Sequence, residues 1–355
     1  RKKIRVGEGR GFLVVCDQGV RLTMTWGPTV YRMLNGVFCV YKPKGVHCNS
    51  VVEHIQRNLA RDLNAQPCYP YERKMREIDP NPNVKTPSIT TEPTSLTTLS
   101  DHKLVLGERY IPPDFRVHFV TGLNKHSSGV LVCSVGSGRE YLSAIKMARY
   151  LRVYHVRGKF GWATDNFSPK GKILNRSTYH HVKKSILDKV CATVQAGHQR
   201  FMFDYAGVTQ DSQEAYELAA AGIVRPEHSD TPPVIYGCHV IDFNLPDFAL
   251  EIHSINETQN YLMKLIHEIG LELRSAAICT QIRRIRYGHF TLEHALLCKH
   301  WTAQEIIRNI ATCRHLLTPN KLLTDVSITE AEGDVVQQLA NGQKPSLVKH
   351  GIDKS

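Results

Sequence analysis

Two short apolar runs in the sequence have the length of strands rather than of helices. They are Asn35–Tyr41 and Gly129–Val135. The first run stops at Lys42 and Pro43, because proline offers no N–H group to a neighbouring strand. The pattern therefore predicts two strands, of which the first is buried.

Three further segments also predict strands. Tyr150–Phe160 alternates, with Tyr154 and other apolar side chains on one face and basic side chains on the other, and the apolar residues of Phe248–Ile252 alternate with Glu251 and His253. Ile278–Ile285 is predicted as a strand with a cluster of arginines at its end. One strand with a basic side is thus expected near the middle of the chain.

Helical spacing of apolar residues predicts two helices that each follow a strand. After Gly136, Ser137 and Glu140 have the spacing of a capping box, and an apolar stripe follows. Later in the chain, Asn256 with Gln259 predicts a helix start and Gly270 a helix end. Between them Tyr261, Leu262, Leu265, Ile266 and Ile269 form one stripe. Met263 lies roughly 130° from the centre of this stripe, so the core of the helix does not account for it.

The pattern weakens in three parts of the chain. Residues 62–113 include a segment rich in proline, threonine and serine, which predicts a mobile insertion. Residues 317–355 read as a polar C-terminal tail. Residues 1–33 carry basic residues in excess over acidic ones, and this balance resembles an organellar presequence. We therefore expect a mitochondrial protein with one main domain at 34–316.

Composition narrows the class of protein. The chain has 355 residues, 42% of them hydrophobic, and 45 Lys+Arg against 33 Asp+Glu give a formal charge of +12. This is globular composition with a preference for a polyanionic partner such as RNA. No run approaches the roughly 20 apolar residues of a membrane span, so none is predicted. Ten scattered cysteines without a C-x-x-C pair favour neither a disulfide framework nor a zinc ribbon.

The sequence gives only weak support for a dinucleotide-binding turn or a zinc site. Gly136 and Gly138 follow an apolar strand, but Tyr141 stands where a dinucleotide-binding turn needs its third glycine. Neighbouring pairs such as Cys298 and His300 lack the second half of a zinc site. We expect no metal and no organic cofactor.

Five segments, in register, resemble the motifs of TruB-type pseudouridine synthases, most closely those of the mitochondrial branch of the family. They are Val40–Gly45, Thr121–Val132, Arg152–Asp165, Glu214–Ala219 and Tyr261–Gly270. The resemblance implies an α+β fold, with a mixed, largely antiparallel sheet and flanking helices. It also implies RNA as the substrate, with a target uridine flipped into a pocket and its glycosidic bond moved from N1 to C5.

The resemblance places two departures at the catalytic centre. The essential aspartate of the family corresponds to Asn124, and the arginine that pairs with that aspartate corresponds to Met263. Because an amide cannot act as a carboxylate nucleophile or base, the chemical step should fail. An arginine without its carboxylate would be an unpaired buried charge, and methionine removes that cost. No aspartate lies between Phe115 and Asp165, so a small shift of the alignment restores none, and Phe119 replaces a histidine usual in the family.

Other positions of the family pattern are kept. The resemblance implies that Tyr154 stacks on the flipped base, whereas the residues alone allow a tyrosine of the core. RNA contacts are expected from a group of basic residues and one tyrosine: Lys42, Arg152, Tyr216, Arg283, Arg284 and Arg286. Each basic residue also suits an ordinary surface position.

Three hypotheses follow from these residues. The first is a protein that binds mitochondrial mRNA, rRNA or tRNA in the family cleft, with lost or impaired isomerisation. The second is an active synthase that uses another carboxylate, or one in which Asn124 is a sequence error. The third is a scaffold in a mitochondrial RNA-processing assembly, where contacts with partner proteins matter more than affinity for RNA.

Overall fold

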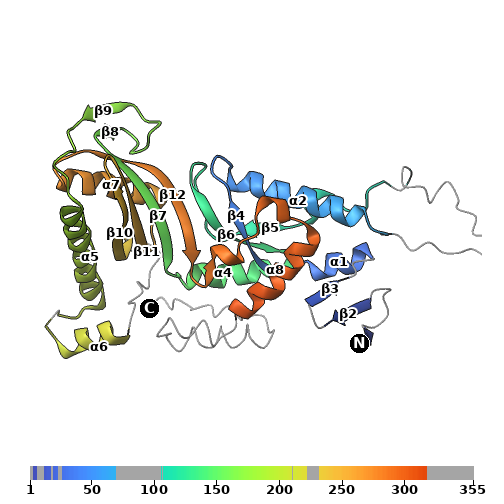
Figure 1. The fold of residues 1–355 in the computed structure, drawn as a ribbon. Helices are drawn as coiled ribbons and strands as arrows, with labels where there is room; N and C mark the ends of the chain where they lie inside the picture. The colour runs from blue at the N-terminus through green and yellow to red at the C-terminus, as the bar shows by residue number, and fades with distance from the viewer. Residues whose placement is uncertain are drawn as a thin grey trace, which may run out of the picture.

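The main feature of the fold is an eight-stranded sheet. The computed structural model describes residues 3–5, 12–16, 19–22, 26–68, 105, 107–209, 211–221 and 232–317. The strand order is β10-β11-β7-β12-β6-β4, with β5 paired to β6 and β13 to β12. Every pairing is antiparallel except that of β12 with β6. The predicted mixed, largely antiparallel sheet with flanking helices is therefore confirmed (Figure 1).

The elements of the main sheet follow the predicted apolar segments. Its strands are β4 (Gly36–Lys42), β5 (Val117–Phe119), β6 (Ser128–Val135), β7 (Arg152–Phe160), β10 (Val234–Asn244), β11 (Asp247–Ile255), β12 (Ala277–Tyr287) and β13 (Phe290–Thr291). The helices are α1 (Gly27–Met33), α2 (Cys48–Asn64), α4 (Arg139–Met147), α5 (Lys184–Ala206), α6 (Gln213–Ala221), α7 (Gln259–Glu272) and α8 (Ala303–Leu316). Two small sheets are added by β1 (Lys3–Arg5), β2 (Phe12–Cys16) and β3 (Gly19–Leu22), and by β8 (Trp162–Thr164) and β9 (Ile173–Arg176).

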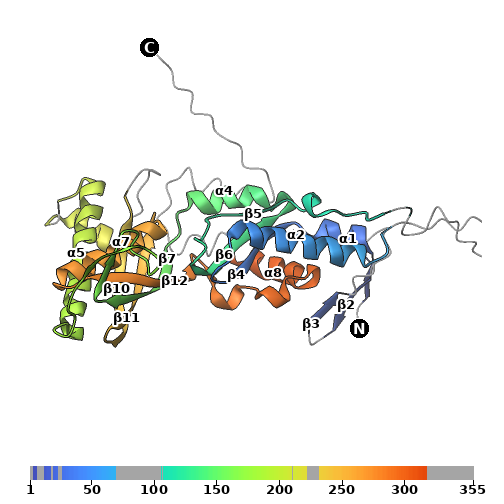
Figure 2. The ribbon, with the colours of Figure 1, turned by 90° about the horizontal axis from the view of Figure 1, so that it is seen from above.

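The molecule is elongated and has two halves, each with helices on the sheet (Figures 1 and 2). In one half, β7, β10, β11 and β12 pack against α5 and α7 around one core cluster. In the other, β4 and β6 are covered on both faces. Phe38 and Val40 of β4 face a cluster with α1, α2 and α8, whereas Val37 and Cys39 face a cluster with α4 and the end of α8. Period-two alternation along β4 therefore serves two separate cores.

The two halves of the sheet join at a short crossing of β6 and β12. Their parallel pairing consists of Arg283 with Ser128 and Arg284 with Gly129. A Cβ atom at Gly129 would lie 2.1 Å from the carbonyl oxygen of Arg284, and Gly129 has a φ of +120°. This position accepts only glycine without strain, because an L side chain there meets main-chain atoms. The Ser-Gly pair at the start of β6 thus has a structural cause.

Three predicted helix signals are wrong. Ser137 lies in a 3-10 turn before α4, whose N-cap is Gly138 without a side-chain cap. Helix α7 is capped by Thr258, whose hydroxyl accepts from the Tyr261 N–H at 3.2 Å, and not by Asn256. Gly270 lies inside α7, where a Cβ atom would lie 2.6 Å from the Ala277 nitrogen. Each residue fits its local pattern, but packing between elements determined the helix ends.

The predicted segment boundaries can be compared with the described elements at both ends of the main domain. Helix α1 lies in the segment assigned to a leader, yet its Val30 is only 2% exposed and belongs to a core cluster. The predicted insertion at 62–113 starts inside α2, which buries Leu63, and its residues 69–104 lie outside the described part of the chain. Residues 318–355 of the predicted tail lie outside it as well. Among the described residues, no helix has the length and apolar character needed to cross a membrane.

Candidate active site

Asn124 lies in the loop between β5 and β6, and main-chain contacts hold it in place. Its N–H donates to the Gln259 side-chain oxygen at 2.7 Å, and its carbonyl accepts from the Lys42 ammonium at 3.0 Å. The thiol of Cys48 contacts both the N–H and the carbonyl of Leu123 at 3.2 Å. The side-chain amide of Asn124 is exposed and forms no hydrogen bond with the described residues. The loop geometry therefore does not depend on the side chain at position 124.

Lys42, the last residue of β4, is fully buried and binds this loop. Its ammonium also donates to the carbonyls of Ser127 at 2.7 Å, Pro43 at 3.2 Å and Lys125 at 3.4 Å. Burial lowers the pKa of Lys42; Cys48 opposes this shift and the charge of Arg284 adds to it. Carbonyl oxygens solvate the ammonium in place of water, so a buried lysine is tolerated here.

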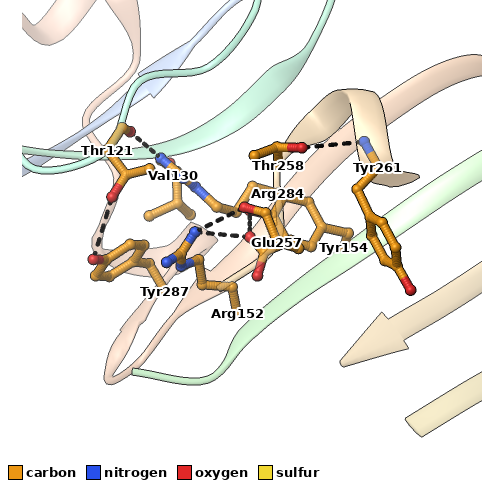
Figure 3. A network of polar contacts seen from close by, with 9 residues as sticks. All are labelled: Thr121, Val130, Arg152, Tyr154, Glu257, Thr258, Tyr261, Arg284 and Tyr287. Carbon is orange, nitrogen blue, oxygen red and sulfur yellow. Dashed lines mark hydrogen bonds and ion pairs between the residues drawn. The ribbon is translucent and has the colours of Figure 1, made fainter. Parts of the chain in front are cut away.

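A buried polar network lies beside the loop, at the start of α7 (Figure 3). One oxygen of Glu257, Oε1, accepts from the Arg152 guanidinium at 2.8 Å and from the Tyr154 hydroxyl at 2.5 Å. The side chain of Glu257 is 1% exposed and that of Arg152 is 10% exposed. The second carboxylate oxygen, Oε2, is buried and has no hydrogen-bond partner among the described residues. A shielded carboxylate is thus paired with one arginine and one tyrosine.

Burial and the charge of Glu257 shift the pKa values of Tyr154 and Arg152. Burial raises the pKa of Tyr154, and the nearby negative charge of Glu257 raises it further. Burial opposes the charge of Arg152, but Glu257 and the neighbouring phenols hold the pKa of Arg152 above its ordinary value. Tyr154 therefore donates as a neutral phenol to a carboxylate that a permanent cation balances.

Arg284 connects this network with the Asn124 loop. It is 1% exposed, and it donates to the carbonyls of Val130 at 2.8 Å and Thr121 at 3.0 Å (Figure 3). The Thr121 hydroxyl lies 3.5 Å from the Tyr287 hydroxyl, and the Arg284 guanidinium lies 5.2 Å from the centre of the Tyr287 ring. The arginine thus ties β12 to the segment that leads into the loop.

The structure accounts for Met263 in a way that the sequence analysis missed. The side chain is half-buried and packs against the core cluster around β7, β11 and α5. Helix α5 contacts α7 through His198 and the Tyr261 hydroxyl, which lie 3.1 Å apart, and Met263 adds a contact with this cluster from outside the predicted stripe. The inference that no core contact explains Met263 is therefore wrong. Gln259, rather than residue 263, forms the hydrogen bond between α7 and the Asn124 loop.

Few of the expected RNA contacts reach the surface. Lys42, Arg152 and Arg284 are buried. Lys42 and Arg284 donate to main-chain carbonyls, and Arg152 donates to Glu257. Arg283 is half-buried above the Tyr41 ring, at 5.6 Å, while Arg286 is exposed and donates to Gly288 at 2.6 Å.

Two predicted aromatic contacts lie in different surroundings. Tyr216 is 70% exposed on α6, which lies far from β4 and β6 (Figure 1). Tyr154 is 1% exposed, so its ring is covered in this structure. Phe119, the third departure from the family pattern, is half-buried against the core of the β4 half. The site brings Tyr154 and Asn124 to one region but leaves Tyr216 outside it.

Sequence reasoning missed Glu257 and Gln259 in their present roles. Both precede or open a helix in a polar stretch, so neither carries a periodic signal. A glutamate followed by a capping threonine was the only local sign. Among the described residues, no group of three or more His, Cys, Asp or Glu side chains is placed to hold a metal ion.

Comparison with known proteins decides the family. The profile of the TruB family pseudouridylate synthase (N terminal domain) matches residues 114–260. The chain is 39% identical over 290 residues to "Pseudouridylate synthase TRUB2, mitochondrial" of Xenopus tropicalis, and the match covers 81% of this chain and 88% of that protein. The chain belongs to the TruB family of pseudouridylate synthases.

Further relatives agree with this membership. The human protein "Pseudouridylate synthase TRUB2, mitochondrial" is 37% identical over 77% of this chain and 82% of its own length. These TruB relatives confirm the predicted mitochondrial localisation. Among solved structures, "Crystal structure of the archaeal box H/ACA sRNP Nop10-Cbf5 complex" matches with a TM-score of 0.44 and 14% identity, over 84% of this chain and 68% of that chain.

Proposed function

We propose that this TruB family member binds mitochondrial RNA in the family cleft but has lost or impaired uridine isomerisation. The observation that carries the proposal is Asn124, which stands at the position of the family aspartate. An amide cannot supply the carboxylate that the reaction requires, and loss of a nucleophile commonly costs on the order of 10⁴-fold or more in rate. The main-chain anchoring of the Asn124 loop supports retention of the cleft without its chemistry.

Met263 supports the same proposal. A methionine that packs against the core of its own half stabilises the helix, whereas an arginine there would need a carboxylate partner. RNA binding is supported by the charge of +12 and by the exposed position of Arg286. We assign Arg283 to the same RNA-binding surface as Arg286, because Arg283 is only half-buried.

The test compares chemistry with binding. Purified protein is incubated with mitochondrial mRNA, rRNA and tRNA, and pseudouridine is measured by mass spectrometry, while RNA affinity is measured over a series of salt concentrations. An active TruB relative serves as the positive control. We expect RNA binding that weakens steeply with salt and no pseudouridine. Product from the unaltered chain would refute the loss of chemistry, and failure to bind RNA at low salt would favour the scaffold hypothesis.

The double substitution Asn124→Asp with Met263→Arg tests whether the missing pair explains the loss. Pseudouridine from the double variant, with none from Asn124→Asp or Met263→Arg alone, would show that both groups are needed. Full activity of the unaltered chain, unchanged by the double substitution, would mean that position 124 is irrelevant to catalysis.

One observation favours the second candidate function, an active synthase with a different carboxylate. Glu257 is buried, pairs with Arg152 and has one oxygen without a partner, which is the arrangement of an arginine-held acid beside Tyr154. If Glu257 acts in place of the family aspartate, the unaltered chain makes pseudouridine and Glu257→Gln abolishes the product. If the chain is inactive, this substitution leaves product formation at zero while Asn124→Asp with Met263→Arg restores it.

A further inference from the structure

Exposed basic side chains surround Asn124 on three separate loops. Lys44 follows β4, Lys125 and His126 follow Asn124 itself, and Lys170 lies in the turn between β8 and β9. All four side chains are exposed. None of the three lysines forms an ion pair within the described part of the chain. These lysines are therefore available to bind an anion.

Hydrogen bonds bring two of these loops together. The N–H of Gly45 donates to the carbonyl of Lys125 at 2.8 Å, which joins the turn after β4 to the Asn124 loop. The buried ammonium of Lys42 binds the carbonyls of Asn124, Lys125 and Ser127. Lys44 and Lys125 are thereby fixed on neighbouring main-chain segments.

The third loop is anchored on β12. The N–H of Cys279 donates to the carbonyl of Phe167 at 2.9 Å, which holds the β8–β9 turn against this strand. The charge of Lys170 is the main cause of a lowered pKa of His126, with burial, Lys125, Lys44 and Lys42 adding to it. This effect agrees with a position of the β8–β9 turn near the Asn124 loop. Asp165 lies in the same turn, where its carboxylate accepts from the Lys172 N–H at 3.0 Å.

The side chain at position 124 changes the net charge of this surface by one unit. An aspartate at this position would place a negative charge beside Lys125, whereas the exposed amide adds none. Such a cluster attracts anions, and the flexible ammonium groups of lysine are common phosphate ligands. An asparagine at this position therefore leaves the surface more attractive to an anion than an aspartate would.

We propose that Lys44, Lys125, His126 and Lys170 form a phosphate-binding site around Asn124 that holds a backbone phosphate of bound RNA. The inference rests on the proposed RNA-binding function and deepens it. A nucleic-acid strand suits the site better than a free nucleotide, because the basic groups are exposed on three loops rather than enclosed. An aromatic platform also lies on the same hairpin, where Lys159 sits 5.1 Å from the centre of the Trp162 ring.

The test removes two positive charges at the site and, in a control variant, two positive charges elsewhere on the surface. Lys125→Gln with Lys170→Gln is compared with Lys146→Gln with Lys189→Gln, which removes two exposed lysines from α4 and α5. The affinity for a uridine-containing single-stranded RNA oligonucleotide is measured over a salt series. On a single strand, each phosphate-binding lysine contributes about 0.7 to the slope of log affinity against log salt. A fourfold rise in salt should thus weaken binding by the site variant about sevenfold less than binding by the unaltered protein.

The control variant should keep the slope of the unaltered protein. Equal losses in both variants, or an unchanged slope in the site variant, would overturn the site while leaving RNA binding intact. If the site variant unfolds, Asn124→Asp takes its place, with Gln199→Glu on α5 as the control that also adds one negative charge. Asn124→Asp should weaken RNA binding and the control should not; equal effects would overturn the proposal.

Competition separates the possible sources of the phosphate. UMP, uridine and inorganic phosphate are titrated against the bound oligonucleotide and against the free protein. Weak displacement by phosphate and UMP, and none by uridine, is expected for a backbone site. Tight binding of UMP without binding of RNA would identify a nucleotide site and refute the backbone assignment. Absence of RNA binding by the unaltered protein would instead defeat the proposed function itself.

Discussion

Glu257→Gln is the substitution whose effect follows most directly from the site geometry. It removes the negative charge that Arg152 contacts at 2.8 Å, while an amide oxygen can still accept from Tyr154. The two side chains of the pair are 10% and 1% exposed, so water screens the lost interaction poorly. Breaking a buried pair from one side leaves an uncompensated charge and costs about 3–5 kcal/mol. We expect a loss of about 3 kcal/mol in the free energy of unfolding, because the amide keeps one hydrogen bond.

Urea unfolding measures this loss from the shift of the midpoint at constant slope. Glu53→Gln is the matched control, because Glu53 pairs with Arg57 at 3.3 Å on the surface, with side chains 59% and 68% exposed. This control should change stability by less than about 0.5 kcal/mol. A loss below about 1 kcal/mol for Glu257→Gln would refute the buried, charge-balanced pair.

A double substitution separates charge from packing. Arg152→Met with Glu257→Leu removes both charges and keeps apolar volume, so it should destabilise the protein less than the sum of the two single changes. The coupling expected for residues in direct contact is about 0.5–3 kcal/mol. Additive effects would mean that the two side chains do not interact in solution.

Three other predictions concern the loop and the crossing strands. Gly129→Ala should lower the free energy of unfolding in urea by at least about 2 kcal/mol, because Gly129 has a φ of +120° and the β12 backbone leaves no room for a Cβ atom. Gly197→Ala is the control: no atom lies within 4 Å of the added Cβ, so this change should stabilise α5 by about 0.5–1 kcal/mol. Equal effects of the two changes would contradict the close approach of β6 and β12. Gln259→Leu should speed hydrogen exchange of the Asn124 amide about fivefold, because one hydrogen bond is lost; unchanged exchange would exclude this bond. RNA affinity should rise as pH falls below about 6.5. The lysines lower the pKa of His126 in the free protein and a bound phosphate restores it, so RNA binding takes up a proton. His126→Gln should abolish this pH dependence, and a dependence that persists in the variant would exclude His126 as its source.

The strands of the fold were predictable because their signals are local. Gly129–Val135 and Tyr150–Phe160 gave strands within two residues of β6 and β7, since apolar runs and alternation reflect burial along one segment. The helix caps were not predictable in the same way. Gly270 fits a helix end by residue type, but its actual constraint is the approach of Ala277, a contact that no local pattern contains.

The residues of the candidate site were likewise predictable only in part. Asn124 could be located from its motif, and its loop lies where that motif predicts. The burial of Lys42, Arg152 and Arg284 could not, because carbonyl groups and a glutamate from distant segments satisfy these charges. Glu257 was missed for the same reason, since a glutamate before a helix is ordinarily a surface residue. Charges matched by long-range partners leave no trace in the hydrophobic pattern.

The way in which Lys42 and Gln259 grip the main chain of residue 124 makes that position interchangeable. Neither grip involves the side chain, so an amide, a carboxylate or a smaller group can occupy the same place on an unchanged frame. Replacement of the residue at position 124 then requires no refolding, so a catalytic member of the family and the non-catalytic RNA binder proposed for this chain can share one architecture.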